Sequence, residues 1–189
     1  AFHLSELGQV TVVVSPLIAL MKDQVQAIMR DRNFSKVAYL NSELSLVDRE
    51  KIIEHVKLGD IDVLYLSPEL LLSYDISHFL GERRLGLVII DEAHLVTTWG
   101  RDFRVDYWFL GNHLRKTRKY SGHDFVIMAC TATAVFGGAN DMVFDCMDSL
   151  YLKSPIYFIG SVTRTDIHFL IGREESPEKG YDTFKVRQT

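Results

Sequence analysis

The 189-residue sequence has few cysteines, no long apolar run and no surplus of positive charge. Its two cysteines, Cys130 and Cys146, form no metal-ligand or disulfide pattern, so we expect a reducing, intracellular setting in the cytoplasm, nucleoid or nucleus. No stretch approaches the roughly 18 apolar residues that span a bilayer, so no membrane partner is expected. The net charge is −4, and any contact with nucleic acid must therefore be local.

Short apolar runs alternate with longer amphipathic stretches along the chain. The apolar runs predict strands at 10–14, 36–40, 62–66, 85–90 and 125–130, and near 156–160. The stretches between them predict helices, one of them capped by Ser45 and stopped by Gly59, and another over about 134–150. Strands that are apolar throughout are buried on both faces, which favours a parallel sheet wrapped by helices on both faces. The predicted fold class is α/β, in a single domain.

Polar side chains follow four of the predicted strands at the point where each strand ends. They are Ser15-Pro16, Ser67-Pro68-Glu69, Asp91-Glu92-Ala93-His94 and Thr131-Ala132-Thr133. Ligands gather at the carboxyl ends of parallel strands in open α/β sheets, so these clusters predict one shared site. Helix capping explains each cluster separately, but it does not explain why a Glu and a His follow Asp91 so closely.

The segment LVIIDEAH (87–94) carries the strongest functional signal. A carboxylate at the end of a buried strand is costly unless another group compensates its charge. Mg²⁺ does so, because it takes one or two protein carboxylates together with water and phosphate oxygens. Asp91 is the predicted magnesium ligand, and Glu92 would orient or deprotonate a water that attacks a terminal phosphate. His94 is a candidate for the same site, although a lone His after a strand is often structural.

Several segments together resemble the RecQ family of superfamily 2 ATP-dependent DNA helicases. DEAH after an apolar strand is similar to the Walker B signature of that superfamily, and residues 91–115 are similar to the family's motif II and the aromatic-rich loop after it. VVVSPLIALMKDQV (12–25) resembles motif Ia, and ACTATA (129–134) resembles motif III. LNS (40–42) and YLSPELL (65–71) also match, so the resemblance runs in family order from about residue 10 to residue 134.

The resemblance implies a RecA-like motor domain that couples ATP hydrolysis to movement along single-stranded DNA in the 3′-to-5′ direction, in repair, recombination or defence. Asp91 would bind the magnesium of Mg-ATP, and Glu92 would activate the attacking water. His94, Thr131 and Thr133 would couple the state of the nucleotide to DNA and to a second RecA-like domain.

The resemblance also assigns contacts to DNA. The aromatic-rich loop would sense single-stranded DNA, because aromatic rings stack on any base and guanidinium groups contact phosphates. Its contributing residues are Trp99, Arg101, Phe103 and Arg104. Core packing is the alternative for the two aromatic residues, but WGRDFR is too polar for a core segment. Short polar residues after the other strands would contact the sugar-phosphate backbone. They are Ser15, Asn41, Ser42 and Ser67.

The sequence departs from the family in lacking a G-x-x-x-x-G-K-[ST] loop, whose backbone N–H groups and Lys hold the phosphates of the nucleotide. The chain starts at Ala1 without an initiator Met, and its first residues do not resemble a signal peptide. We therefore expect an N-terminally truncated domain that is inactive as an isolated fragment.

Residues 1–160 are assigned to the first RecA-like motor domain, and residues 161–189 to a linker or the start of a second motor domain. One alternative is a non-catalytic DNA- or protein-binding domain derived from a helicase, and the adjacent carboxylates of Asp91 and Glu92 argue against it. The other is a metal-dependent hydrolase unrelated to ATP. It is disfavoured because the seven histidines show no metal-ligand spacing.

Overall fold

The computed structural model describes residues 1–97, 105–133, 135, 137, 141–160, 170–174 and 183–187. The chain divides into two units, Ala1–Pro155 and Ile156–Thr189. In the second unit, β6 (Leu170–Glu174) and β7 (Thr183–Arg187) pair antiparallel, with Leu170 opposite Arg187. None of the described helices is long and apolar enough to cross a bilayer.

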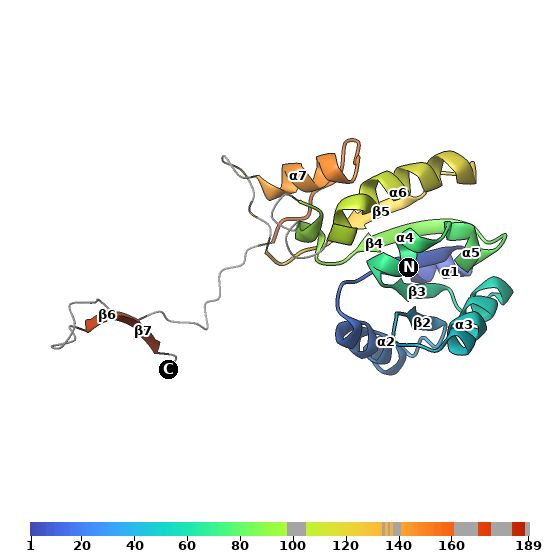
Figure 1. Cartoon of the computed structure of the whole chain (residues 1–189), viewed down its shortest axis with the longest axis horizontal. Helices are drawn as coiled ribbons and strands as arrows, with labels where there is room; N and C mark the ends of the chain where they lie inside the picture. The colour runs from blue at the N-terminus through green and yellow to red at the C-terminus, as the bar shows by residue number, and fades with distance from the viewer. Residues whose placement is uncertain are drawn as a thin grey trace. The chain divides into compact units, whose positions relative to one another are not determined.

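The first unit is built on a five-stranded parallel sheet (Figure 1). Its strands are β1 (Val10–Val14), β2 (Val37–Leu40), β3 (Val63–Leu66), β4 (Leu85–Ile90) and β5 (Val126–Ala129). The spatial order is β2-β3-β1-β4-β5, and each neighbouring pair is parallel. The register sets Val14 of β1 opposite Ile90 of β4, so the residues that follow these two strands meet at the same edge of the sheet.

Helices connect the strands of the sheet, as the amphipathic segments between the apolar runs predict. They are α1 (Phe2–Glu6), α2 (Ile18–Arg32), α3 (Leu46–Leu58), α4 (Pro68–Ser73), α5 (Ile76–Leu80), η1 (a 3-10 helix, Ala93–Val96), α6 (Val105–Ser121) and α7 (Met142–Ser149). The predicted start and stop of α3 are confirmed. The Ser45 hydroxyl accepts a hydrogen bond from the Asp48 N–H at 3.1 Å, and Gly59 ends the helix at φ +90°.

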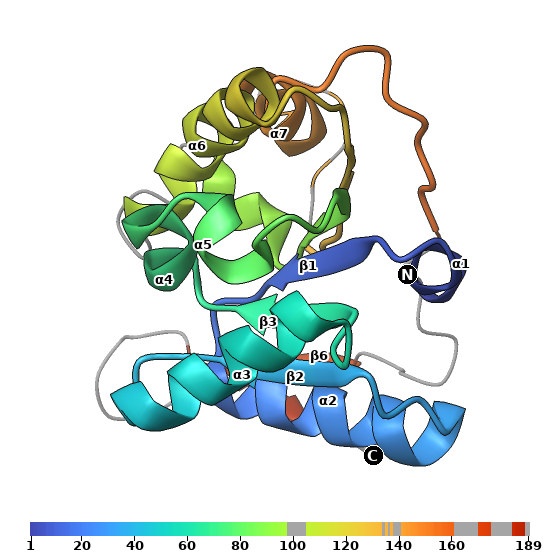
Figure 2. The ribbon, with the colours of Figure 1, turned by 90° about the vertical axis from the view of Figure 1, so that its right-hand side faces the viewer.

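Apolar side chains pack on both faces of the sheet, which confirms the predicted α/β layers. On one face, strand residues such as Val12 and Leu64 join the core with α3, α5, α6 and α7. On the other face, Val13 and Val63 pack with Met21 of α2. Figure 1 shows α2 and α3 on opposite sides of β2, and Figure 2 shows α6 and α7 together on another part of the unit.

The prediction that every strand is buried on both faces was wrong for β5. Phe125 and Ile127 pack in the core, whereas Val126 is 64% exposed and Met128 is 50% exposed. β5 is last in the strand order, and α2, which covers that face elsewhere, packs with residues of β1, β2 and β3. The apolar sequence of β5 therefore predicted the strand but not the exposure of its outer face.

Two predictions after β5 also needed correction. The helix expected over about 134–150 is the shorter α7, because the Asp141 carboxylate accepts a hydrogen bond from the Phe144 N–H at 2.9 Å and caps the helix there. Residues 156–160, which the structure describes, have no strand partner, and the strand predicted there was wrong. Ile156 is 82% exposed and Phe158 is 93% exposed. An apolar run forms a strand only where another strand pairs with it.

Candidate functional site

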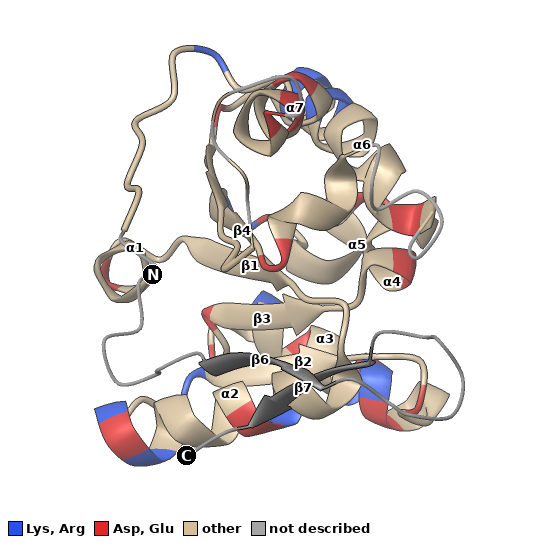
Figure 3. Cartoon of the chain, turned by 90° about the vertical axis from the view of Figure 1, so that its left-hand side faces the viewer, with Lys and Arg blue, Asp and Glu red and all other residues tan. Residues whose placement is uncertain are grey.

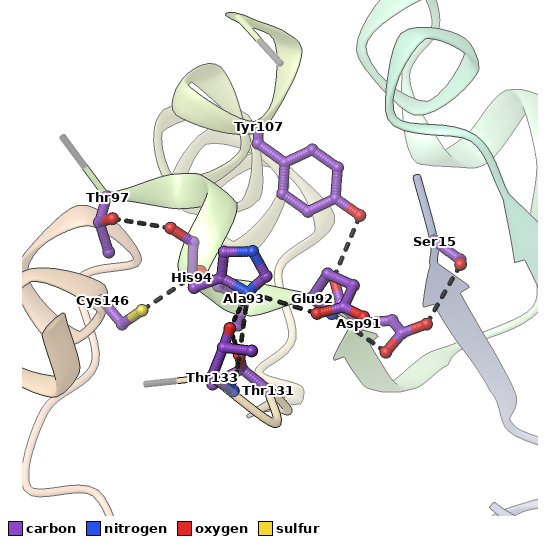
Figure 4. Close-up of polar contacts among 10 residues, drawn as sticks. All are labelled: Ser15, Asp91, Glu92, Ala93, His94, Thr97, Tyr107, Thr131, Thr133 and Cys146. Atoms are coloured by element: carbon purple, nitrogen blue, oxygen red, sulfur yellow. Dashed lines mark hydrogen bonds and ion pairs between the residues drawn. The ribbon is translucent and has the colours of Figure 1, made fainter. Parts of the chain in front are cut away.

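The ends of β1 and β4 are joined by a side-chain hydrogen bond at the predicted edge of the sheet (Figure 4). Ser15 is fully buried, and its hydroxyl donates to Asp91 Oδ2 at 3.2 Å. Asp91 follows β4 directly, and its N–H donates to the Val14 carbonyl at 2.9 Å. The parallel register therefore continues through Asp91 and sets its carboxylate beside Ser15.

Glu92 reverses the chain after Asp91 by adopting a left-handed backbone conformation, with φ +50° and ψ +45°. This conformation costs a non-glycine residue about 1 kcal/mol or more, so the surrounding contacts have to hold it. The Glu92 N–H donates to Asp91 Oδ1 at 3.0 Å. After the reversal, the Ala93 N–H donates to the Cys130 carbonyl at 2.8 Å and ties the turn to the end of β5.

The His94 ring brings the ends of β4 and β5 together, as Figure 4 shows. Its Nδ1 atom lies 3.0 Å from Thr131 Oγ1, 3.1 Å from Thr133 Oγ1 and 3.3 Å from Glu92 Oε2. One ring nitrogen either carries one proton or offers one lone pair. With its proton, Nδ1 would donate to one of these oxygens, and without it Nδ1 would accept from a threonine hydroxyl. A single proton position therefore decides which neighbours the ring binds.

The other short polar residues follow β2 and β3 and are mostly buried. Asn41 is fully buried, and its Oδ1 accepts a hydrogen bond from the Glu43 N–H at 3.0 Å. Neither Asn41 Nδ2 nor the hydroxyl of Ser67 has a hydrogen-bond partner among the described residues. Ser42 is exposed, and its carbonyl accepts from the Arg49 guanidinium at 2.7 Å. These positions share the edge of the sheet with Asp91, but Asn41 and Ser67 offer little accessible surface.

The aromatic-rich loop is a prediction that the structure leaves open. Trp99, Arg101, Phe103 and Arg104 lie outside the described residues. Elsewhere the charges are interspersed, and Figure 3 shows Lys and Arg scattered among Asp and Glu over the helices in that view.

Three residues that contact the Asp91–His94 turn were missed by reasoning from the sequence. The Tyr107 hydroxyl of α6 donates to the Asp91 carbonyl at 3.1 Å, and the Cys146 thiol of α7 donates to the Ala93 carbonyl at 3.2 Å. The Thr97 hydroxyl donates to the His94 carbonyl at 2.7 Å. The only sequence signal for Tyr107 was that it is a tyrosine, with a polar hydroxyl, inside a predicted amphipathic helix. The sequence around Cys146 gave no such signal.

Two neighbouring groups respond to the negative charge of the site. Burial first, and the charge of Asp91 second, raise the pKa of the Tyr65 phenol on β3. The same two causes, in the same order, raise the pKa of the Cys130 thiol at the end of β5. Because both pKa values are raised, the Tyr65 phenol and the Cys130 thiol stay neutral at physiological pH.

The oxygen ligands of the turn suit a hard cation whose remaining ligands are waters and substrate phosphates. In the described parts of the chain, no three or more His, Cys, Asp or Glu side chains form a group that could hold a metal. Asp91 and Glu92 present two adjacent carboxylates at the end of β4. Magnesium is commonly bound by one or two protein carboxylates, with waters and substrate phosphates completing its shell, so the residues present fit Mg²⁺ with a nucleotide.

Comparison with known sequences identifies helicases over most of the chain. The family model of the DEAD/DEAH box helicases matches residues 2–141. ATP-dependent DNA helicase RecQ of Pasteurella multocida (strain Pm70) is 34% identical over 178 residues, which are 94% of this chain and 26% of the relative. Probable ATP-dependent DNA helicase RecS of Bacillus subtilis (strain 168) is 38% identical over 161 residues, which are 85% of this chain and 30% of the relative. The chain thus spans less than a third of either relative.

Solved structures show the same fold at lower sequence identity. The Pyrococcus furiosus Hef helicase domain aligns with a TM-score of 0.53 and 18% identity, over 76% of this chain and 27% of that one. The DUF1998 helicase MrfA, bound to DNA and AMPPNP, aligns with a TM-score of 0.53 and 19% identity, over 68% of this chain and 18% of that one. The predicted RecA-like fold is confirmed.

Proposed function

The chain belongs to the DEAD/DEAH box helicase family and is RecQ-like, and from this premise we propose that it is the motor domain of an ATP-dependent DNA helicase. The observation that supports this most is the contact of His94 with Glu92 on one side and with Thr131 and Thr133 on the other. A group that acts on the nucleotide is thereby joined to the segment that follows β5.

In this proposal Asp91 binds the magnesium of the nucleotide and Glu92 activates the attacking water. Magnesium, bound together with ATP, supplies positive charge that offsets the phosphates. Asp91 would hold it, since its carboxylate is fixed by Ser15 and by the Glu92 N–H. Glu92 is one-third exposed, and its carboxylate would orient the attacking water and accept its proton.

His94, Thr131 and Thr133 would pass the state of the nucleotide to DNA and to a second RecA-like domain. When Glu92 takes a proton, its attraction for His94 Nδ1 weakens, and the ring is free to bind the threonine hydroxyls instead. Residues 131–133, whose threonine hydroxyls lie within hydrogen-bond distance of His94, would then change their contacts with the ring. Translocation in the 3′-to-5′ direction on single-stranded DNA, inside the cell, is the activity that we infer for the whole protein.

The proposed DNA contacts comprise a stacking part and a backbone part. Trp99, Arg101, Phe103 and Arg104 would stack on bases and contact phosphates, because aromatic faces bind any base. Ser42 is exposed and would contact the sugar-phosphate backbone directly. Ser15, Asn41 and Ser67 are buried, so their contacts with DNA would require a local opening of the strand ends.

We also propose that these 189 residues by themselves neither hydrolyse ATP at a useful rate nor unwind DNA, since they contain no G-x-x-x-x-G-K-[ST] segment. Steady-state ATP turnover by the isolated chain, with and without single-stranded DNA, tests this. DNA-stimulated turnover by the isolated 189 residues would contradict the proposal.

Glu92→Gln in the full-length protein tests the catalytic assignment. The amide keeps the size and the polar contacts of the side chain but cannot accept a proton, so ATP turnover should be abolished while binding of a fluorescent ATP analogue persists. Glu54→Gln, at an exposed position of α3, is the matched control and should behave as the wild type. Unchanged turnover in Glu92→Gln would contradict the catalytic role of Glu92, whereas a wild-type protein without turnover would favour a non-catalytic binding domain.

A further inference from the structure

The Asp91–His94 turn is held by groups from outside it at each of its three peptide units. We propose that Tyr107 and Cys146 are positioning residues that clamp this turn and keep Glu92 in the geometry that ATP hydrolysis requires. This inference rests on the proposed function, and it concerns how two helices far along the chain maintain the conformation of the turn.

The first peptide unit, between Asp91 and Glu92, is held at both of its polar atoms. Its carbonyl oxygen accepts the Tyr107 hydroxyl at 3.1 Å, and its N–H donates to Asp91 Oδ1 at 3.0 Å. The orientation of this peptide plane sets φ of Glu92, which is +50°. If the plane rotated to relieve that angle, both hydrogen bonds would break, so Tyr107 stabilises the left-handed conformation directly.

The next two peptide units are held by β5 and by α7. The Ala93 N–H donates to the Cys130 carbonyl at 2.8 Å, and the Glu92 carbonyl accepts from the Leu95 N–H at 2.9 Å. The Ala93 carbonyl accepts the Cys146 thiol at 3.2 Å, and Cys146 is 7% exposed. Figure 4 shows Tyr107 and Cys146 reaching the turn from different elements. The turn is therefore fixed between α6, β5 and α7.

The helices that carry the two clamping residues approach each other closely at one point, where Gly111 of α6 meets the C-terminal end of α7. A Cβ atom on Gly111 of α6 would lie 1.8 Å from the Ser149 carbonyl oxygen of α7, so only glycine permits this approach. Gly111 is one helical turn after Tyr107, and Ser149 is three residues after Cys146. Figures 1 and 2 both show α6 and α7 side by side. Each helix thus holds the turn through a contact of its own, Tyr107 from α6 and Cys146 from α7.

The thiol of Cys146 keeps the proton that this contact needs. Burial first, and the nearby Asp145 carboxylate second, raise its pKa to about 11. At neutral pH the group is therefore a thiol that can donate to a carbonyl, and it is not a thiolate that the carbonyl would repel.

Tyr107→Phe in the full-length protein tests the clamp, because it removes only the hydroxyl. We expect kcat for DNA-stimulated ATP hydrolysis to fall roughly tenfold, as expected for a small misplacement of a reacting group. KM for ATP should stay close to the wild-type value, and the thermal midpoint should fall only slightly, because one buried hydrogen bond is lost. A general loss of structure would instead change both together. Tyr120→Phe, at an exposed position of the same helix, is the matched control and should be silent.

The second contact is tested by restoring its donor. Cys146→Ala should lower kcat, and Cys146→Ser, which again carries a donor to the Ala93 carbonyl, should recover most of it. If Tyr107→Phe keeps full kcat, or if Cys146→Ala and Cys146→Ser are equally active, the clamp is refuted. Glu92→Gln, measured in the same assay, distinguishes failure of the clamp from failure of the proposed catalytic role. Loss of turnover in that variant with full activity in Tyr107→Phe overturns the clamp alone, whereas full activity in Glu92→Gln overturns the proposed catalytic role itself.

Discussion

The hydroxyl of Ser15 donates to Asp91 Oδ2 at 3.2 Å and links the ends of the two central strands. Ser15 is fully buried, and its N–H donates to the Leu66 carbonyl at 3.2 Å. Both donors of this residue are thus used within the protein. The contact gives Ser15 a role in orienting Asp91, in addition to the DNA contact that the resemblance implies.

We predict that Ser15→Ala raises the magnesium concentration for half-maximal ATP turnover about tenfold, since removing a partner that orients a metal ligand commonly costs 10–100-fold in affinity or activity. A magnesium titration of ATP hydrolysis by the full-length protein measures this. Ser77→Ala, at an exposed serine of α5, is the control. Should Ser15→Ala leave the magnesium dependence unchanged and raise the DNA requirement instead, the DNA contact is its main role.

Trp99→Ala is predicted to weaken the stimulation of ATP turnover by single-stranded DNA. Stacking of a base on an aromatic ring is worth about 1–3 kcal/mol, so the DNA concentration for half-maximal stimulation should rise by roughly one to two orders of magnitude. Turnover without DNA should not change. Trp108→Ala, in α6, provides the comparison at the second tryptophan of the chain. Unaltered stimulation in Trp99→Ala would contradict the coupling role of the loop.

Gly111→Ala is predicted to destabilise the protein by about 2 kcal/mol, as overpacking does in a tightly packed contact. Alanine is favoured over glycine in a helix by about 1 kcal/mol, so the sign depends on the space available. Here the new Cβ would lie 1.8 Å from the Ser149 carbonyl oxygen and 3.2 Å from Leu150 Cα, and both are backbone atoms. Urea unfolding measures the change, with exposed Lys116→Ala as the control. A stabilised Gly111→Ala variant would show that α7 can move away freely.

Arg83→Ala is predicted to lower the free energy of unfolding by about 3 kcal/mol, because it leaves a buried charge without its main partner. The Asp62 side chain is 2% exposed and pairs with the Arg83 guanidinium, which also donates to the Val56 carbonyl at 2.7 Å and the Ile61 carbonyl at 2.6 Å. Chemical denaturation at pH 7 measures the loss. Arg84→Ala, at the exposed neighbouring arginine, should change stability far less.

The loss of unfolding free energy in Arg83→Ala should also depend on pH. Burial opposes ionisation of Asp62, but hydrogen bonds from Ser5, Arg83 and Lys36 outweigh it and hold the pKa of this carboxyl below its ordinary value. A lowered pKa contributes stability above the ordinary value of about 4, and the contribution is lost as the pH falls through the folded-state pKa. The difference in unfolding free energy between wild type and variant should therefore be largest near pH 7 and become smaller in acid. A gap that does not change with pH would contradict the ion pair.

Cys146 is predicted to resist alkylation at pH 8 in the folded protein. Burial first and Asp145 second raise its pKa to about 11, and the thiolate is the reactive form. Cys130 is only half-buried, so it should react first, although burial and Asp91 also raise its pKa. Iodoacetamide labelling followed by peptide mass analysis distinguishes the two sites. Rapid native labelling of Cys146 would contradict its burial under the turn.

The local sequence was sufficient to predict those elements that are determined by residues within or next to them. Ser45 and Gly59 set the ends of α3 through a hydroxyl cap and a left-handed glycine, and both were predictable because each acts on its own helix. Continuous apolar runs likewise predicted β1 to β5. The run at 156–160 has the same composition but no partner strand among the described residues, so its failure as a strand could not be read from composition.

For the Asp91–His94 turn, too, the sequence determined some features and the tertiary structure determined others. The sequence by itself determined that Asp91, Glu92 and His94 follow a buried strand. It also predicted that Thr131 and Thr133, after the next strand, share their site, and the resemblance added a coupling role for these two residues. Only the tertiary structure decided that Tyr107 and Cys146 hold the turn, 16 and 53 residues from the carbonyl groups that they bind. A strand end is fixed by neighbouring residues, whereas the partner of a side chain across the fold depends on where distant helices lie, and the close approach of α6 to the end of α7 at Gly111 is one example.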